Sequence, residues 1–129
     1  MSPLTFIATY RVLPDRIDEF RDFAIEYAEF VDREEPQVAN LGLYFSADGS
    51  RFVHVIVLPD TDAMEAHLPL VQTFITKSSE FVVAEEITVL GMPGPRLQAA
   101  LDGNAQNGAS ITVVAQPGPG FARSAVVHA

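Results

Sequence analysis

The chain has 129 residues, of which 48% are hydrophobic and 19% charged, and its formal net charge is −9. This length suits one domain, and so large an apolar share excludes an intrinsically disordered chain. There is no cysteine, which excludes disulfides, thiolate metal sites and a cysteine nucleophile. The acidic balance repels phosphate backbones and argues against nucleic-acid partners. We expect no membrane partner and a cytoplasmic location, because no apolar run reaches the roughly 20 residues of a membrane span and residues 1–5 do not resemble a secretory signal.

Charge and glycine content change near residue 91. Residues 1–91 hold 16 acidic and six basic side chains, whereas residues 92–129 hold one acidic and two basic side chains and five of the eight glycines. We therefore expect a compact domain over 1–91. The remaining residues, 92–129, are expected to form an extension that consists of a linker, an extra strand and a mobile tail.

The N-terminal part of the chain predicts a strand followed by a helix. Side chains alternate over residues 5–12 as they do in a strand, and Pro14 ends it because proline has no N–H for a central strand. Apolar side chains then recur at steps of three and four until Pro36, which disfavours helical geometry at Glu35. The opposite helix face is acidic, a pattern typical of a solvated surface.

Residues 38–46 and 51–58 predict the two strands of a hairpin. The Asp48–Gly49 dipeptide between them suits a type I′ turn, in which both residues have positive φ. A two-residue loop would place Leu43 opposite His54. Both faces of this hairpin are apolar, whereas a sheet with one wet face alternates polar and apolar residues. We therefore expect helices to cover one face and another partner to cover the other.

The rest of the chain predicts a helix, a strand and a less regular end. Residues 60–82 predict a helix that Pro69 kinks or restarts. After it we expect a core strand over 85–90, one or two helical turns over 96–101, a loop over 102–110, a fifth strand over 111–116 and a mobile segment over the last nine residues. The fifth strand is expected to join a sheet edge, either its own or that of a partner.

The element order strand–helix–strand–strand–helix–strand is that of the ferredoxin-like split βαβ arrangement, an α+β fold with a four-stranded antiparallel sheet. In detail the chain resembles the dimeric α+β barrel group, and most closely its antibiotic-biosynthesis-monooxygenase-like (ABM-like) domains. The resemblance covers about residues 4–91. It rests on the strand 6–12 that leads into Pro14-Asp15, the strand pair around Asp48–Gly49, and the segment from Asp60 to Leu68 that contains His67.

This resemblance implies a homodimer, because in that group the sheets of two subunits pack face to face. It leaves the activity open, since the group includes monooxygenases, isomerases, haem-degrading enzymes and decarboxylases. The chain departs from the group in two respects. It has no tryptophan, and its first strand has no asparagine, whereas haem-degrading and polyketide-oxidising members resemble one another in having both around the pocket.

His54 and His67 are the candidate catalytic residues. His54 lies mid-strand among apolar side chains, so it is either a pocket base or a core histidine bonded to a carbonyl or water. His67 lies on the inner side of a helix, where it either faces His54 or is tied to a backbone group. Burial would lower the pKa of His54 below its free value of about 6.5. His128 lies in the tail and has no expected role.

Four aromatic side chains are the candidate walls of a ligand pocket: Phe6, Tyr10, Phe52 and Phe74. Arg11 and Arg51 either bind the carboxylate of a ligand or are surface charges. We expect no metal, because the two candidate histidines lack a third ligand placed by spacing. We also expect no bound cofactor, because the sequence has no nucleotide-binding motif.

Two functions remain open. The first is a cofactor-independent monooxygenase or isomerase that acts on a small aromatic or polyketide-like molecule in a pocket between sheet and helices. The second is a non-catalytic dimeric domain that binds a small molecule or has a structural role. The missing tryptophan and asparagine favour the second function, and a buried His54 that faces His67 would favour the first.

Overall fold

A computed structural model describes residues 2–121 and 123 of the chain. Over this range the elements follow in the order β1 (Leu4–Val12), α1 (Ile17–Glu34), β2 (Asn40–Phe45), β3 (Arg51–Leu58), α2 (Thr61–Leu70), α3 (Gln72–Ser78), β4 (Val82–Leu90), α4 (Pro95–Gln106) and β5 (Ser110–Val114). A single 3₁₀ turn at Pro14–Arg16 joins β1 to α1. Of the last nine residues only Phe121 and Arg123 are described, so the expected mobile tail and His128 lie outside the described residues.

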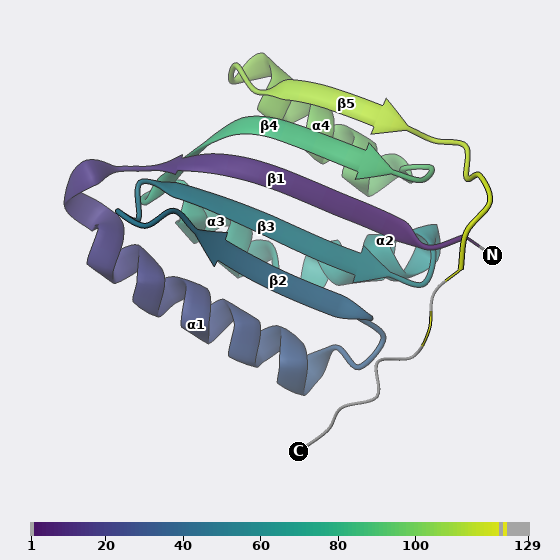
Figure 1. Cartoon of the computed structure of the whole chain (residues 1–129), viewed down its shortest axis with the longest axis horizontal. Coiled ribbons are helices and arrows are strands. Elements are labelled where there is room, and N and C mark those ends of the chain that lie inside the picture. The colour runs from purple at the N-terminus through teal and green to yellow at the C-terminus, as the bar shows by residue number, and fades with distance from the viewer. Residues whose placement is uncertain (1, 122, 124–129) are drawn as a thin grey trace.

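The strands form one sheet in the order β2-β3-β1-β4-β5. Antiparallel pairing joins β2, β3, β1 and β4, as the ferredoxin-like prediction requires. The extra strand β5 joins its own sheet and pairs parallel with β4. Figure 1 shows the helices on one side of this sheet, with α1 along the edge strand β2. The split βαβ arrangement with an additional strand is therefore confirmed. None of the described helices is both long enough and apolar enough to cross a membrane.

Three segments near the C-terminus differ in length from the prediction. β4 begins at Val82 rather than at residue 85, and β5 spans Ser110–Val114 rather than 111–116. α4 continues through residues 102–106, which the glycine- and asparagine-rich composition assigned to a loop. The helix persists because Leu97 and Leu101 bury its inner side, and such packing outweighs weak local helix propensity.

The break expected from Pro69 separates α2 from α3 at Val71. Because Pro69 has no N–H, the carbonyl oxygen of Glu65 has no helical partner. Nη1 of Arg96 on α4 donates to this oxygen instead, at 3.3 Å. The kink therefore also supplies a contact that ties α2 to α4.

The β2–β3 hairpin has the predicted register but a different turn. Leu43 pairs with His54, as expected. No described residue other than glycine has a positive φ, so only Gly49, at 77°, lies in the left-handed region and the type I′ prediction is wrong. The Asp48 carboxylate accepts hydrogen bonds from the Ser46 hydroxyl and from both the hydroxyl and the backbone N–H of Ser50. These three hydrogen bonds hold the backbone of the turn between β2 and β3 in place.

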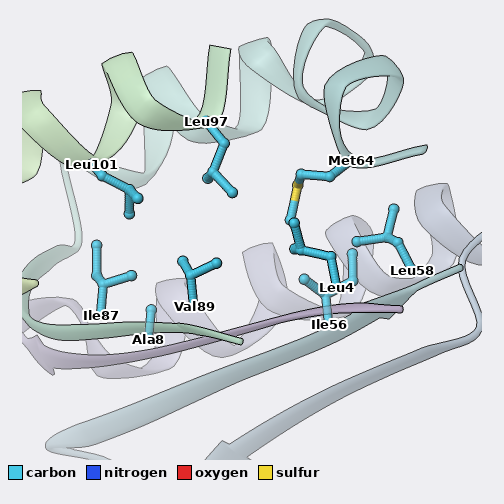
Figure 2. Close-up of a cluster of buried hydrophobic side chains, with 9 residues drawn as sticks. All are labelled: Leu4, Ala8, Ile56, Leu58, Met64, Ile87, Val89, Leu97 and Leu101. Carbon is cyan, nitrogen blue, oxygen red and sulfur yellow. The ribbon is translucent and has the colours of Figure 1, made fainter. Parts of the chain in front are cut away.

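The hydrophobic core lies between the sheet and the helices. In Figure 2, Leu97 and Leu101 of α4 point toward Ala8, Ile87 and Val89 of the sheet. Each of the nine residues in this cluster is at most 2% exposed. Residues beyond 91 therefore contribute to the same core as residues 4–91. The division of the chain at residue 91 stays a prediction.

Candidate functional site

A cavity of about 150 Å³ lies between the sheet and the four helices. Side chains of β1 and β3 line it from the sheet, and side chains of all four helices cover it. Its aromatic lining consists of Phe6, Tyr10, Phe20, Phe23, Tyr27, Phe52 and Phe74. Two further lining residues, Ile75 of α3 and Ala100 of α4, are exposed. The cavity therefore opens to the surface between α3 and α4.

The structure brings the candidate site residues together at this cavity. Its lining includes all six of them: Phe6, Tyr10, Phe52, His54, His67 and Phe74. The two arginines lie elsewhere, because Arg11 and Arg51 are exposed and Arg51 pairs with Glu85 at 3.3 Å. Tyr44 is 61% exposed on the opposite face of the sheet. The alternation of β1 and β3 is what directs these aromatic side chains and His54 to one face.

His67 forms a buried pair with Glu35, a residue for which the sequence predicted no role beyond the end of a helix. Nδ1 of His67 lies 2.7 Å from Oε1 of Glu35, and the two residues are 3% and 2% exposed. With an ionised Glu35, Nδ1–H donates to the carboxylate, so Nε2 carries the free lone pair. Nε2 makes no hydrogen bond with a described residue, and it is not fully enclosed by protein atoms. Because His67 lines the cavity, we take this nitrogen to border it.

The sequence contains a signal that Glu35 is buried. Phe20, Ala24 and Val31 are the buried residues of α1, and Glu35 follows Val31 by four residues, on the same helical stripe. A carboxylate at a core position requires a partner, because burying an unpaired charge is costly. The stripe therefore indicated a buried acid, although it could not identify a partner 32 residues away.

His54 is paired with Tyr27 of α1. Nε2 of His54 lies 2.9 Å from the Tyr27 hydroxyl, and Nδ1 is buried without a hydrogen-bond partner among the described residues. Burial, with a smaller contribution from the nearby His67, lowers the pKa of His54 to about 4. Burial and the charge of Glu35 raise the pKa of Tyr27 well above its usual range. Both side chains are therefore neutral at pH 7.

Tyr10 presents a hydroxyl that has no hydrogen-bond partner among the described residues. The ring of Tyr10 lies against Phe52, with the two centroids 5.6 Å apart. Burial raises the pKa of Tyr10 to about 12, so the hydroxyl keeps its proton at neutral pH. Tyr10 and Tyr27 both line the cavity, and an ionised Tyr10 would also raise the pKa of Tyr27. The lining of the cavity thus includes a phenolic donor as well as the two imidazole side chains.

The described residues contain no group of three or more His, Asp or Glu side chains arranged to hold a metal ion. The polar groups that are present suit proton transfer instead. A carboxylate-oriented imidazole can accept a proton from a bound acid, and a neutral phenol can donate a hydrogen bond to the anion that results. Phe6 packs edge-on against His54, with centroids 5.6 Å apart, so these polar groups face a largely aromatic lining.

Three solved structures illustrate what this chain is similar to. The structure of MupZ from Pseudomonas fluorescens superposes with a TM-score of 0.70 and 16% identity, and the match covers 99% of this chain and 100% of that one. SnoaB from Streptomyces nogalater, a cofactor-independent oxygenase, gives a TM-score of 0.58 and 21% identity over 73% of this chain and 96% of its own. A protein of Chloroflexus aurantiacus, provisionally named an antibiotic biosynthesis monooxygenase, gives 0.57 and 18% identity over 72% and 95% of the two chains.

No protein-family model matches the chain, and a search of curated proteins gives no sequence match. The structural matches agree with the element order and the pairing of the four antiparallel strands. The chain therefore has the ferredoxin-like fold that these three proteins have.

Proposed function

We propose that the protein is a cofactor-independent monooxygenase that removes a proton from a small aromatic molecule bound in the cavity. The observation that carries this proposal is the buried Glu35–His67 pair, whose free ring nitrogen borders an apolar, aromatic cavity. The fold is also that of SnoaB, a cofactor-independent oxygenase, which supports the reaction class.

The proposed first step is a proton transfer from a hydroxyl of the bound ring to Nε2 of His67. Glu35 holds the imidazole in the Nδ1–H tautomer and stabilises the imidazolium that forms. Tyr10 donates a hydrogen bond to the resulting anion, which the dry cavity could not otherwise solvate. Overall, a phenol and one O₂ give a quinone and one water. One oxygen atom enters the ring, and the other leaves as water with the hydroxyl hydrogen and one ring hydrogen.

Of the two candidate histidines, His67 is the better base. Nε2 of His54 is already bonded to Tyr27, and its Nδ1 is enclosed by protein, so His54 offers no free lone pair to a ligand. His67 has both an orienting carboxylate and a free nitrogen. We assign His54 and Tyr27 to the positioning of the cavity wall.

Oxygen consumption tests this function. Purified protein is mixed with phenolic compounds of one to three rings. O₂ uptake and quinone absorbance are recorded before and after treatment with a chelator. We expect protein-dependent uptake of one O₂ per quinone that persists after chelation. The His67→Gln variant should retain about 1% of the rate, as expected for the loss of a general base. Uptake that His67→Gln leaves unchanged, or no uptake with any of these compounds, would contradict the proposal.

A non-catalytic binding domain is the second candidate, and the absence of tryptophan favours it. The cavity would then bind the same small aromatic molecule without consuming oxygen. An isomerase would use the same base but would also consume no oxygen. Saturable binding without O₂ uptake distinguishes these two from the oxygenase, and product analysis separates them from each other.

We also propose that the protein functions as a homodimer through the sheet face opposite the helices. Ile7, Val53, Val55 and Val57 lie on that face, and it also exposes Tyr44, Leu90 and Val114. An apolar face of this kind on a free monomer is an interaction surface. Light scattering should give twice the 14.0 kDa mass of the chain at micromolar concentration. A mass of 14.0 kDa would contradict the dimer.

A further inference from the structure

We infer that the ligand of the cavity is a single six-membered ring with two oxygen substituents, one that donates to His67 and one that accepts from Tyr10. This inference rests on the proposed function, because it takes His67 as the base. It goes beyond that function by excluding the multi-ring compounds that the fold alone would allow. Two independent observations carry it, namely the size of the cavity and the pairing of its polar groups.

The size of the cavity limits the ligand to one ring. Its volume is about 150 Å³. An engineered protein cavity of roughly this volume, lined by apolar side chains, binds one benzene molecule. Drug-sized ligands with several rings occupy pockets of roughly 300 Å³ or more. The core leucines of α4, which are 1% exposed, limit the cavity on one side, so a second fused ring would have to extend through the opening between α3 and α4.

The pairing of the polar lining groups leaves the Tyr10 hydroxyl free to bind a ligand. Ser78 and Asn104 each donate to a backbone carbonyl of their own helix, at 2.7 and 2.8 Å. Tyr27 and His54 are bonded to each other. Nδ1 of His54 also has no partner, but protein encloses it, so the Tyr10 hydroxyl is left as a donor without an acceptor among the described residues that a ligand in the cavity can reach.

The free groups define the polar pattern of the ligand. The Tyr10 hydroxyl is not enclosed by protein, so an oxygen atom of a ligand in the cavity can accept a hydrogen bond from it. Nε2 of His67 is a free acceptor at the cavity and can bind a donor of the ligand. A ring with one hydroxyl to donate and a second oxygen to accept satisfies both groups. Benzene satisfies neither group, phenol offers both of them the same oxygen atom, and a ring with two oxygen substituents offers a separate oxygen to each.

Binding without oxygen tests this inference separately from catalysis. Dissociation constants are measured anaerobically by NMR titration for benzene, phenol, the three dihydroxybenzenes and a dihydroxyanthracene. We expect at least one dihydroxybenzene to bind about tenfold more tightly than phenol, which is the gain expected from one hydrogen bond. The dihydroxyanthracene should not bind in the cavity, as judged by the absence of shifts at Phe6 and His54.

The variant Tyr10→Phe tests the polar group, and Tyr44→Phe is its matched control because Tyr44 is 61% exposed on the other sheet face. Tyr10→Phe should bind dihydroxybenzene and phenol equally well, whereas Tyr44→Phe should keep the tenfold difference. Far-UV circular dichroism checks that both variants fold, and light scattering checks that Tyr44→Phe, which lies on the proposed dimer face, keeps the mass of the unmodified protein. Equal binding of one-ring and three-ring compounds, or an unchanged preference in Tyr10→Phe, would overturn the inference. Binding of a dihydroxybenzene without O₂ uptake would instead contradict the oxygenase and leave this inference standing.

Discussion

The carboxylate of Glu35 lies 2.7 Å from Nδ1 of His67, although 32 residues separate the two in the chain. Glu35 caps the end of α1, where its backbone N–H donates to the carbonyl of Val31. His67 lies on α2 before the proline kink. The pair therefore joins two of the four helices that cover the cavity and fixes the orientation of the imidazole at the same time. This double role allows the structural and the chemical contribution to be separated by mutation.

The chemical contribution is tested by Glu35→Gln. Glutamine keeps the shape of the side chain and a hydrogen-bond acceptor for His67, but it removes the charge that would stabilise an imidazolium. We expect the turnover number to fall about 100-fold while the anaerobic dissociation constant of the ligand changes less than about threefold. The matched control is Glu34→Gln, because Glu34 is exposed and lies outside the cavity. Equal turnover in the two variants would show that Glu35 has no part in proton transfer.

The structural contribution is tested by a double-mutant cycle. His67→Leu leaves the Glu35 carboxylate buried without its histidine partner, so we expect a loss of about 3–5 kcal/mol in the free energy of unfolding. In the double variant Glu35→Leu/His67→Leu both polar groups are replaced by apolar ones. This variant should be more stable than His67→Leu alone. Urea denaturation measures all four proteins, and additive effects of the two substitutions would contradict a direct pair.

His54 gives the protein a predicted sensitivity to acid. Its pKa is about 4 in the folded protein, below the free value of about 6.5. Between these values the unfolded chain binds a proton at His54 and the folded protein does not, so stability falls as the pH decreases through this window. The loss amounts to at most about 3 kcal/mol at pH 4, and above pH 6.5 His54 contributes no pH dependence.

Urea denaturation between pH 7 and 4.5 measures this effect. The variant His54→Phe should lose the part of the decline that the imidazole causes. Tyr27→Phe removes the same 2.9 Å hydrogen bond but retains the imidazole, so it should keep the decline. An NMR titration of His54 with a midpoint near 6.5 would contradict the assigned burial.

Part of the site follows from local pattern. Alternation in β1 and β3 was sufficient to place Phe6, Tyr10, Phe52 and His54 on one face, because side chains of a strand point to opposite faces in turn. The hairpin register, with Leu43 opposite His54, followed from the length of the loop even though the turn type was wrong. Periodicity thus determines the direction of a side chain without knowledge of its neighbours.

Other parts depend on contacts between distant segments and could not be predicted locally. The partner of Glu35 is set by the packing of α1 against α2, which no local pattern encodes. Residues 102–106 have a composition typical of a loop, yet they continue a helix that two buried leucines hold against the sheet. In both places tertiary packing overrides the local preference.

The last prediction concerns the attachment of α4, the helix that closes one side of the cavity. Its N-cap is Gly94, which has no side chain to satisfy the free N–H groups of the first turn. Glu65 of α2 supplies this cap, because its carboxylate oxygens accept from the backbone N–H groups of Arg96 and Leu97 at 2.9 and 3.0 Å. A Cβ at Gly94 would lie 2.5 Å from Cδ of Glu65, so glycine is what allows the carboxylate to approach.

Glu65→Ala should therefore lower the free energy of unfolding by about 1–2 kcal/mol, the cost of a lost N-cap. It should also increase hydrogen exchange in α4 (Pro95–Gln106) and weaken anaerobic binding of the ring ligand, because α4 carries Leu97 and Leu101 into the cavity. Gly94→Ala should have the same effects in a weaker form, since its Cβ displaces the carboxylate. The matched control, Glu26→Ala, removes an acid from the exposed face of α1 and should change neither exchange nor binding. Unchanged exchange in α4 of Glu65→Ala would show that the leucines alone hold this helix in place.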